Sequence, residues 1–266
     1  MTLINLPIAL FRLVALIGHV LISALAAVGR ISSFAAKVIW RGVTPPYYPL
    51  RLLEQLLLIG WFSLPVVGLT AIFTGAALAQ QTFTAGTRFN ATATVPAIVV
   101  LGMVRELGPV LVGLMVAGRV SSSMAAEIGT MRVTEQLDAM ATLRTDPLRY
   151  LIAPRLFAAL LAMPLLVLIA NAIGIFGGYL IAVYKHDFNA VGYLKTTRQY
   201  LEADDFMMAL VKAAVFGFFI ALMGCYHGLK TQGGAAGVGI ATTRAVVSTF
   251  ILILLSNLLI TVIAFG

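Results

Sequence analysis

Five long apolar segments, separated by shorter polar ones, dominate the hydropathy pattern of the chain. They cover about residues 56–79, 95–117, 156–184, 206–226 and 245–265. The last of these measures about 31 Å as a helix at ~1.5 Å per residue, close to the ~30 Å hydrocarbon thickness of a bilayer. Helices of a soluble core do not need apolar runs of this length. The pattern predicts an all-α integral membrane protein with five transmembrane helices.

The N-terminal segment has a different pattern. Residues 3–27 are largely apolar, but a basic residue interrupts the run and three more follow it, at Arg12, Arg30, Lys37 and Arg41. A charge in the middle of the apolar stretch is not typical of a signal peptide. It favours a helix that lies in the membrane interface, and prolines between 44 and 49 end that helix. We therefore expect an interfacial or elbow segment over 1–49 and a transmembrane domain over 50–266.

Composition supports a membrane protein and excludes a nucleic-acid binder. Apolar residues make up 61% of the chain and charged residues 11%, against about 25% charged residues in an average soluble domain. The net charge of +8 could suggest nucleic acid. However, most basic residues flank apolar runs instead of covering a polar domain, which is typical of residues that orient helices in a membrane.

The basic residues also predict the orientation. Segments 1–55, 118–155 and 227–244 together contain twelve Lys and Arg, whereas 80–94 and 185–205 contain four. The positive-inside rule places the first set in the cytoplasm. With five spans, the N-terminus is then cytoplasmic and the C-terminus lies on the outer side, which is the periplasm if the membrane is a bacterial inner membrane.

Two adjacent charges, Arg105 and Glu106, lie about ten residues into the second span. A charge near the bilayer centre costs at least ~2.5–3.5 kcal/mol, so each must face a polar partner or cavity. Neighbours in sequence diverge around a helix, so the two cannot form a simple pair on one face. Gln80 and Gln81 are candidate partners. Pro109 cannot donate to the carbonyl of Arg105, which predicts a kink there and a free carbonyl.

The two charges have two interpretations: the wall of a substrate pocket, or a structural interhelical ion pair. Lys212, the one charge in the fourth span, lies near the start of that span, where its long stem can reach the interface. In the last span Thr249 and Ser256, seven residues apart, share one face, and Asn257 and Thr261 follow at i, i+4 spacing. Such groups suit a subunit interface, although burial within one chain explains them equally well.

The segment between the second and third spans is long and mixed in charge. Around Leu137 and Met140 it has the pattern of a short amphipathic helix. That helix could lie on the membrane or fit a groove on a soluble partner. Its acidic residues favour the partner, because the cytoplasmic leaflet is itself anionic.

The sequence contains no recognisable catalytic, metal-binding or nucleotide-binding motif. We find no catalytic set and no metal-ligand spacing among the three histidines and one cysteine. The glycine-rich segment 228–239 lacks the spacing of a nucleotide-binding P-loop, and we expect it to be a flexible turn. The chain is therefore predicted to be a transport subunit and not an enzyme.

Several motifs together resemble the MlaE-type permeases of ABC transporters, the family also called MlaE/YrbE. They cover roughly residues 50–266 and read Leu101-Gly-Met-Val-Arg-Glu-Leu-Gly-Pro-Val110, Ala117-Gly-Arg119, Ala126-Glu-Ile-Gly-Thr-Met131, Glu135-Gln-Leu-Asp-Ala139, Asp146-Pro-Leu-Arg-Tyr-Leu151 and Gly237-Val-Gly-Ile-Ala-Thr-Thr-Arg-Ala-Val-Val247.

The resemblance implies a function and a set of partners. Such permeases belong to ATP-driven systems, associated with MCE proteins, that move phospholipid or related lipids between the bacterial inner membrane and the outer envelope. It implies a homodimer of this chain and a separate cytoplasmic ATPase that carries ATP and Mg, so no cofactor is expected on this chain. It further implies an MCE-domain substrate-binding protein on the outer side and, in some systems, a STAS-domain regulator.

The resemblance also implies two sites on this chain. A lipid pocket between the two copies would include Leu78, Gln81, Arg105, Glu106 and Pro109. The ATPase-coupling region, formed or supported by 127–138, would include Glu127, Arg132, Glu135, Gln136 and Asp138.

Two functions of other classes stay open on the sequence. An ion-coupled secondary transporter or proton channel could use Arg105 and Glu106, although the halves of the chain show no inverted repeat. A purely structural membrane anchor for a soluble complex is the other alternative. The sequence does not identify the lipid or the direction of transport.

Overall fold

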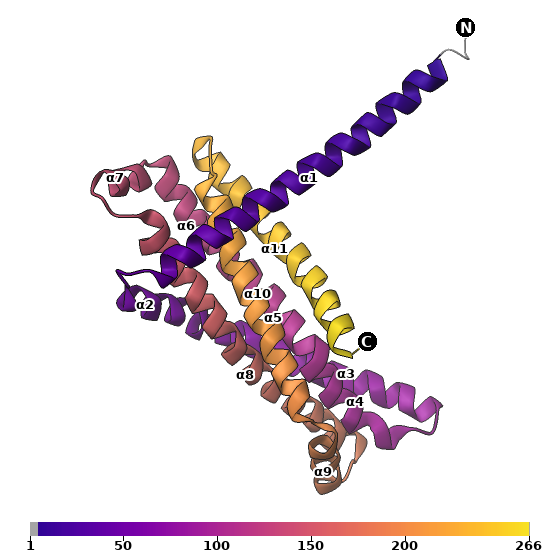
Figure 1. Ribbon diagram of the computed structural model, residues 1–266. Coiled ribbons are helices and arrows are strands. Elements are labelled where there is room, and N and C mark those ends of the chain that lie inside the picture. Colours follow the sequence, from indigo (N-terminus) through magenta and orange to yellow (C-terminus); the bar gives the residue numbers. More distant parts are fainter. Residues whose placement is uncertain (1–4, 266) are drawn as a thin grey trace. The chain divides into compact units, whose positions relative to one another are not determined.

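The computed structural model describes residues 5–265, and within them the side chains of 18–264 apart from residues 20 and 24. Over this range the chain forms α-helices joined by short turns and contains no strand (Figure 1). The helices are α1 (Asn5–Val43), α2 (Pro49–Ile59), α3 (Leu64–Arg88), α4 (Val95–Gly102), α5 (Gly108–Val116), α6 (Ser122–Val133), α7 (Gln136–Thr142), α8 (Ala153–His186), α9 (Ala190–Tyr200), α10 (Ala203–Leu229) and α11 (Gly234–Phe265).

The chain divides into two compact units, Met1–Pro46 and Tyr47–Gly266. In the described part of the first unit, α1 is one continuous helix. Its segment Leu21–Val43 is long and apolar enough to cross a membrane. The interfacial placement expected for this segment stays a prediction, as does the domain boundary after residue 49.

The second unit contains the five membrane spans predicted from the sequence. Each predicted apolar segment lies within one long helical stretch: Pro49–Arg88, Thr92–Val133, Leu148–His186, Ala203–Leu229 and, for all but the last residue of the fifth, Gly234–Ala264. The all-α membrane fold is thus confirmed. The stretches exceed the predicted spans because helices continue into the polar segments. The second span, for example, runs on through α6, which we expected to belong to a cytoplasmic loop.

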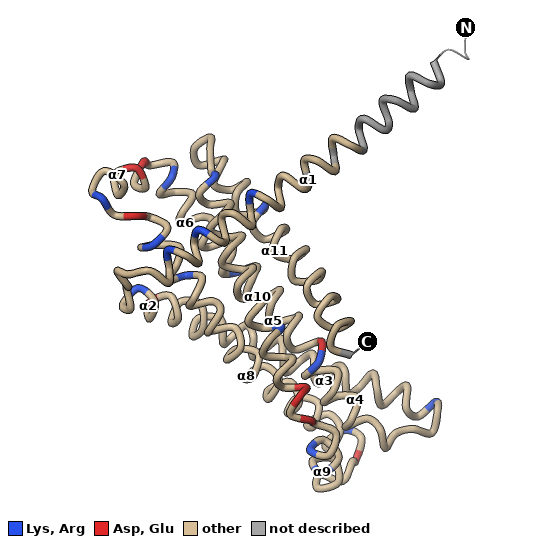
Figure 2. Tube along the Cα trace, viewed as in Figure 1, with Lys and Arg blue, Asp and Glu red and all other residues tan. Residues whose placement is uncertain are grey.

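Helices α8 and α10 lie at the centre of the second unit. Helix α3 packs against α8, and α10 packs against α8, α11 and α6 (Figure 1). Helices α7 and α9 lie at opposite ends of this bundle. Charged residues gather at these two ends, while most of the trace between them is uncharged (Figure 2). This distribution is expected for a bundle with an apolar belt between two polar surfaces.

Glycine lets α3 and α8 approach until their backbones touch. A Cβ atom at Gly75 would lie 1.8 Å from the carbonyl oxygen of Gly174, and one at Gly177 would lie 2.3 Å from the carbonyl oxygen of Ile72. Both distances are far inside van der Waals contact. Close packing of small residues is a main source of helix association in membranes, where the hydrophobic effect does not hold helices together.

Arg119 holds the end of α2 against the second span. Its Nη2 lies 2.5 Å from the carbonyl oxygen of Leu58 and 2.8 Å from the hydroxyl oxygen of Ser63. The last carbonyls of a helix have no partner within that helix. The guanidinium therefore satisfies the C-terminal end of α2, where Gly60 begins the break before α3.

One helix of the second unit, α9, and the early start of another, α11, were not predicted. Helix α9 lies in a segment that we read as an outer loop. Asn189 caps it by accepting a hydrogen bond from the backbone N–H of Gly192 at 3.0 Å. Helix α11 begins at Gly234, so the flexible turn expected over 228–239 is limited to a few residues around Gly233, whose φ is +89°.

We predict that Gly75→Ala destabilises the second unit by about 1–3 kcal/mol, because the added methyl group forces α3 away from α8. Thermal unfolding of the purified full chain in detergent measures this loss. Gly239→Ala is the matched control, since a Cβ atom there meets nothing within 4 Å. Equal melting temperatures for the two variants would contradict the close backbone contact.

Candidate functional site

Arg105 and Glu106 lie in a π-helical turn over Met103–Leu107, between α4 and α5. The backbone N–H of Gly108 donates to the carbonyl of Met103, five residues earlier. Pro109 has no N–H to donate. The sequence predicted a kink and a free Arg105 carbonyl at this point, and the chain accommodates the proline through a wider turn. Turns of this kind occur often at functional sites.

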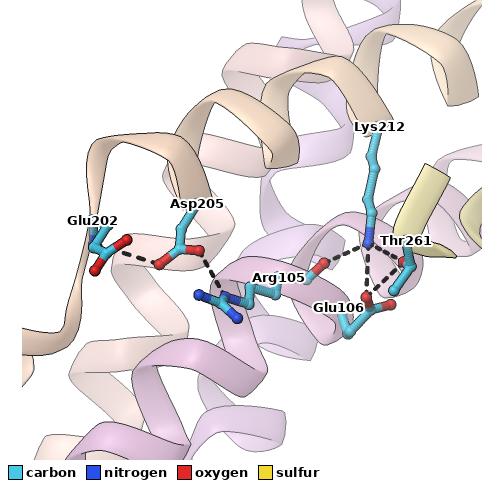
Figure 3. Close-up of polar contacts among 6 residues, drawn as sticks. All are labelled: Arg105, Glu106, Glu202, Asp205, Lys212 and Thr261. Carbon is cyan, nitrogen blue, oxygen red and sulfur yellow. Dashed lines mark hydrogen bonds and ion pairs between the residues drawn. The ribbon is translucent and has the colours of Figure 1, made fainter. Parts of the chain in front are cut away.

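Lys212 of α10 occupies the position opposite this turn. Its ammonium lies 2.7 Å from the carbonyl oxygen of Arg105, 2.8 Å from Oε1 of Glu106 and 2.8 Å from the hydroxyl oxygen of Thr261 (Figure 3). The side chain is fully buried. Our expectation that Lys212 reaches the interface is therefore wrong. Its three donors are matched by three oxygens, one of them the carbonyl released by Pro109.

Glu106 connects the second span to α11 as well as to α10. Its Oε2 accepts from Nδ2 of Asn257 at 2.8 Å, and its Oε1 accepts from the hydroxyl of Thr261 at 2.8 Å. In a low-dielectric environment such charge-assisted bonds are stronger than in water. The polar residues of the last span therefore serve contacts within one chain, which was one of the two explanations that the sequence left open.

Arg105 turns the other way and pairs with Asp205, in the first turn of α10. Its Nε lies 2.6 Å from Oδ1 of Asp205, whose side chain is 1% exposed (Figure 3). The other carboxylate oxygen accepts from the backbone N–H of Glu202, as one half of a capping box at the start of α10. One carboxylate thus caps a helix and neutralises an arginine. As expected, Arg105 and Glu106 have separate partners.

Neither glutamine expected beside the two charges is a partner of Arg105 or Glu106 in the contacts that the structure describes. Oε1 of Gln80 lies 2.9 Å from Nε2 of His186, and the side chain of Gln81 is exposed. Of the remaining predicted pocket residues, Leu78 is half-buried beside Gly102 and Pro109 is buried. The sequence did not point to Asp205, because it lies in a polar segment that we counted as a loop.

Both charges of the turn keep an accessible side. The side chain of Arg105 is 35% exposed and that of Glu106 is 39% exposed, whereas their partners Asp205 and Lys212 are almost completely covered. The two ion pairs join the second span to α10, and the hydrogen bonds of Asn257 and Thr261 add α11. The ion pairs also leave part of an arginine and part of a glutamate on the surface of the single chain.

The predicted amphipathic helix between the second and third spans is present as α7. Leu137 is its buried anchor, at 4% exposure. Glu135 begins it with a left-handed φ of +61°, and Asp138 pairs with Arg132 at 2.9 Å between exposed side chains. Four of the predicted coupling residues, Arg132, Glu135, Gln136 and Asp138, are exposed.

Glu127, the fifth predicted coupling residue, belongs to α6 and is 49% exposed. It pairs with Arg155 at the start of α8, whose side chain is 2% exposed. The predicted coupling region therefore extends over two helices, and Glu127 ties it to the third span.

We predict that Lys212→Met costs about 3–5 kcal/mol, because the substitution leaves Glu106 without its cation in a partly buried site. The double variant Glu106→Gln with Lys212→Met should recover part of this loss, which a thermal double-mutant cycle on the full chain measures. Lys195→Met, at an exposed position of α9, serves as control and should change little. A Lys212→Met variant as stable as this control would refute the buried ion pair.

Comparison with known proteins places the chain in a family. The family model described as Permease MlaE matches residues 52–263. A probable ABC transporter permease protein of Rickettsia bellii is 54% identical over 235 residues, 88% of this chain and 91% of the relative. A probable ABC transporter permease protein of Synechocystis is 42% identical over 205 residues, 77% of this chain and 78% of the relative. The chloroplastic protein TRIGALACTOSYLDIACYLGLYCEROL 1 of Arabidopsis thaliana is 37% identical over 238 residues, 84% of this chain and 67% of the relative.

These matches favour an ABC transporter over the ion-driven transporter or proton channel that the sequence left open. The matched region includes both the charged turn and α7. The chain belongs to the MlaE family of ABC transporter permeases.

Proposed function

We propose that this permease moves phospholipid or a related lipid between a bacterial inner membrane and the outer envelope, driven by ATP hydrolysis on its ATPase partner. The charged turn carries this proposal. Arg105 and Glu106 lie within the apolar segment 95–117, and each keeps one side accessible. Groups of this kind suit a ligand that joins a charged headgroup to apolar chains. The name of one relative contains the glycolipid trigalactosyldiacylglycerol, which supports a lipid cargo.

The accessible sides of the two charges also support a homodimer. A charge exposed to hydrocarbon costs several kcal/mol, so Arg105 and Glu106 require a cover or a wet cavity in the membrane. A second copy of the chain facing this surface would enclose a polar chamber between the copies. Leu78 and Gln81 of α3 would then contribute to its wall, since Leu78 lies beside Gly102, one turn before Glu106.

The exposed surface of α6 and α7 suits the docking of the ATPase. Helix α7 is anchored by Leu137 and presents Glu135, Gln136 and Asp138 to solvent. We propose that an MCE-domain protein, on the opposite side of the membrane, exchanges the lipid with this permease, and that a STAS-domain protein regulates the ATPase. In this arrangement ATP and Mg bind to the ATPase alone, and the N-terminus of the permease is cytoplasmic while the C-terminus is periplasmic.

Transport by the purified chain and its ATPase, reconstituted in vesicles with a fluorescent phospholipid, tests the function. We predict that Gln81→Trp lowers ATP-dependent lipid movement severalfold, because the indole fills part of the chamber. Thr87→Trp, at another exposed position of α3, should leave the rate unchanged. Equal rates for both variants would argue against a lipid path beside α3. Proton flux through vesicles that hold the lone chain, abolished by Glu106→Gln, would support a proton channel instead.

ATPase binding tests the coupling surface separately. We predict that Glu135→Lys with Asp138→Lys weakens co-purification of the ATPase about tenfold or more, since two charge reversals at a docking surface cost more than ~1.4 kcal/mol. Asp204→Lys, at an exposed position near α9 and far from α7 along the chain, should have no effect. An ATPase that binds the double variant as well as it binds this control would rule out α7 as the docking element.

A further inference from the structure

Away from the charged turn, an open cavity of about 460 Å³ lies between α8 and α9. Leu168, Ala172 and Ile175 recur every three or four residues along α8 and so share one face. Leu194 of α9 and Phe206 of α10 complete the apolar part of the lining. The volume lies within the ~300–1,000 Å³ range of ligand-binding pockets, and an apolar lining of this kind suits a hydrocarbon chain.

Helix α9 borders this cavity with one face and is held in place by the residues of another face. Tyr193 is 2% exposed and packs edge-on against the rings of Tyr179 and Phe188, at centroid distances of 5.7 and 6.3 Å. Burial raises the pKa of its hydroxyl to about 12, so the phenol stays neutral at physiological pH. The N-cap at Asn189 holds the start of the helix. The cavity is therefore bordered by a fixed helix.

Three residues with polar side chains line the same cavity. Asn171 is 1% exposed and Thr197 is 8% exposed, and within the described residues their side-chain polar atoms have no hydrogen-bond partner. The amide of Asn171 is directed toward Gly108 of α5, where an added Cβ atom would lie 1.8 Å from its Oδ1, so Thr197 and Arg198 are the donors available to a ligand in the cavity. Unpaired polar groups are costly when they are buried. Arg198 is exposed at the edge of the cavity, and no ion pair is described for it. Donors beside an apolar cavity match a ligand whose acceptors lie at one end of a hydrocarbon chain.

The residues around the opening of the cavity are large, apolar and exposed. Along α8 the neighbouring Leu165 and Ile169 are 60% and 41% exposed, and on α9 and α10 Val191 and Met207 are 76% and 61% exposed. In a membrane-spanning chain, such large exposed apolar side chains face acyl chains. The cavity therefore opens among exposed apolar side chains, which favours a ligand that comes from the lipid phase.

Three acidic residues lie nearest to Arg198 in sequence: Glu202, Asp204 and Asp205. Asp205 pairs with Arg105, and both Asp205 and Glu202 take part in the capping box of α10, while Asp204 is exposed. No ion pair between Arg198 and any of the three is described. An anionic headgroup is the complementary partner for this arginine, since guanidinium binds phosphate oxygens in a fork geometry.

We propose that this cavity binds one acyl chain of an anionic glycerophospholipid, with the phosphate at Arg198 and an ester carbonyl within reach of Thr197. The site goes beyond the transport function proposed above. It lies on the lipid-facing side of α8 and α9 and would hold its lipid whatever cargo the transporter carries.

Photolabelling in vesicles tests this site without any measurement of transport. The full chain is reconstituted in phosphatidylcholine vesicles that contain phosphatidylglycerol with a diazirine near the end of one acyl chain, and labelled peptides are identified by mass spectrometry. We expect label within 168–175. Ala172→Trp should fill the cavity and lower this labelling severalfold; Ala172 is exposed, so the fold tolerates the change. Ile169→Trp, three residues away on α8, is the matched control and should keep the label.

Charge substitutions on α9 test the headgroup contact. Arg198→Glu should lower labelling by the phosphatidylglycerol probe severalfold relative to a phosphatidylcholine probe with the same diazirine. Lys195→Glu makes the same charge change on the same helix, at a residue outside the cavity lining, and should retain the preference. Equal losses in these two variants would mean general surface attraction. Labelling unaffected by Ala172→Trp would mean ordinary boundary lipid. Either result would overturn the proposal.

Discussion

An ammonium group buried within the bilayer must be matched by oxygens of the same protein, and Lys212 shows how this chain meets that requirement. Its three acceptors come from two helical stretches, the second span and α11, and Lys212 itself belongs to α10. One acceptor exists because Pro109 has no amide to donate. Pro109, Lys212 and Glu106 would each be unfavourable alone inside a membrane helix. Together they satisfy one another, because Lys212 binds both the carbonyl that Pro109 leaves free and the carboxylate of Glu106. The positions of three spans follow from this one set of contacts.

The same requirement explains other polar residues of the second unit. Arg119 satisfies the last carbonyls of α2, and Asp205 both caps α10 and neutralises Arg105. Each of these side chains supplies a partner for a backbone group that a helix end or break exposes. Charges in this family member are thus part of the helix architecture, and the same charges leave a polar surface beside the second span, where we propose that a lipid headgroup binds.

The sequence predicted the five spans and the need for separate partners at Arg105 and Glu106, because apolar length and helical geometry act locally. It did not identify the partners. In the sequence Lys212 has the pattern of an interfacial lysine, and Asp205 lies in a predicted loop. Both are at least 100 residues from their partners in the charged turn, and only tertiary packing brings them together. Helix α9 was missed because its apolar face is short, although Asn189 followed by Gly192 is a local capping signal. The lipid pocket expected from the family resemblance stays a prediction; of its residues Leu78 is half-buried, Gln81 is exposed and Pro109 is buried.

The contact between Gly75 and Gly174 has a consequence for how the bundle can move. Where two backbones touch without intervening side chains, turning either helix about its axis drives a neighbouring side chain, such as that of Ile72, into the opposing backbone. Helices α3 and α8 therefore cannot rotate independently and move as one rigid body. Any rearrangement during a transport cycle must occur between other pairs of helices, where side chains separate the backbones.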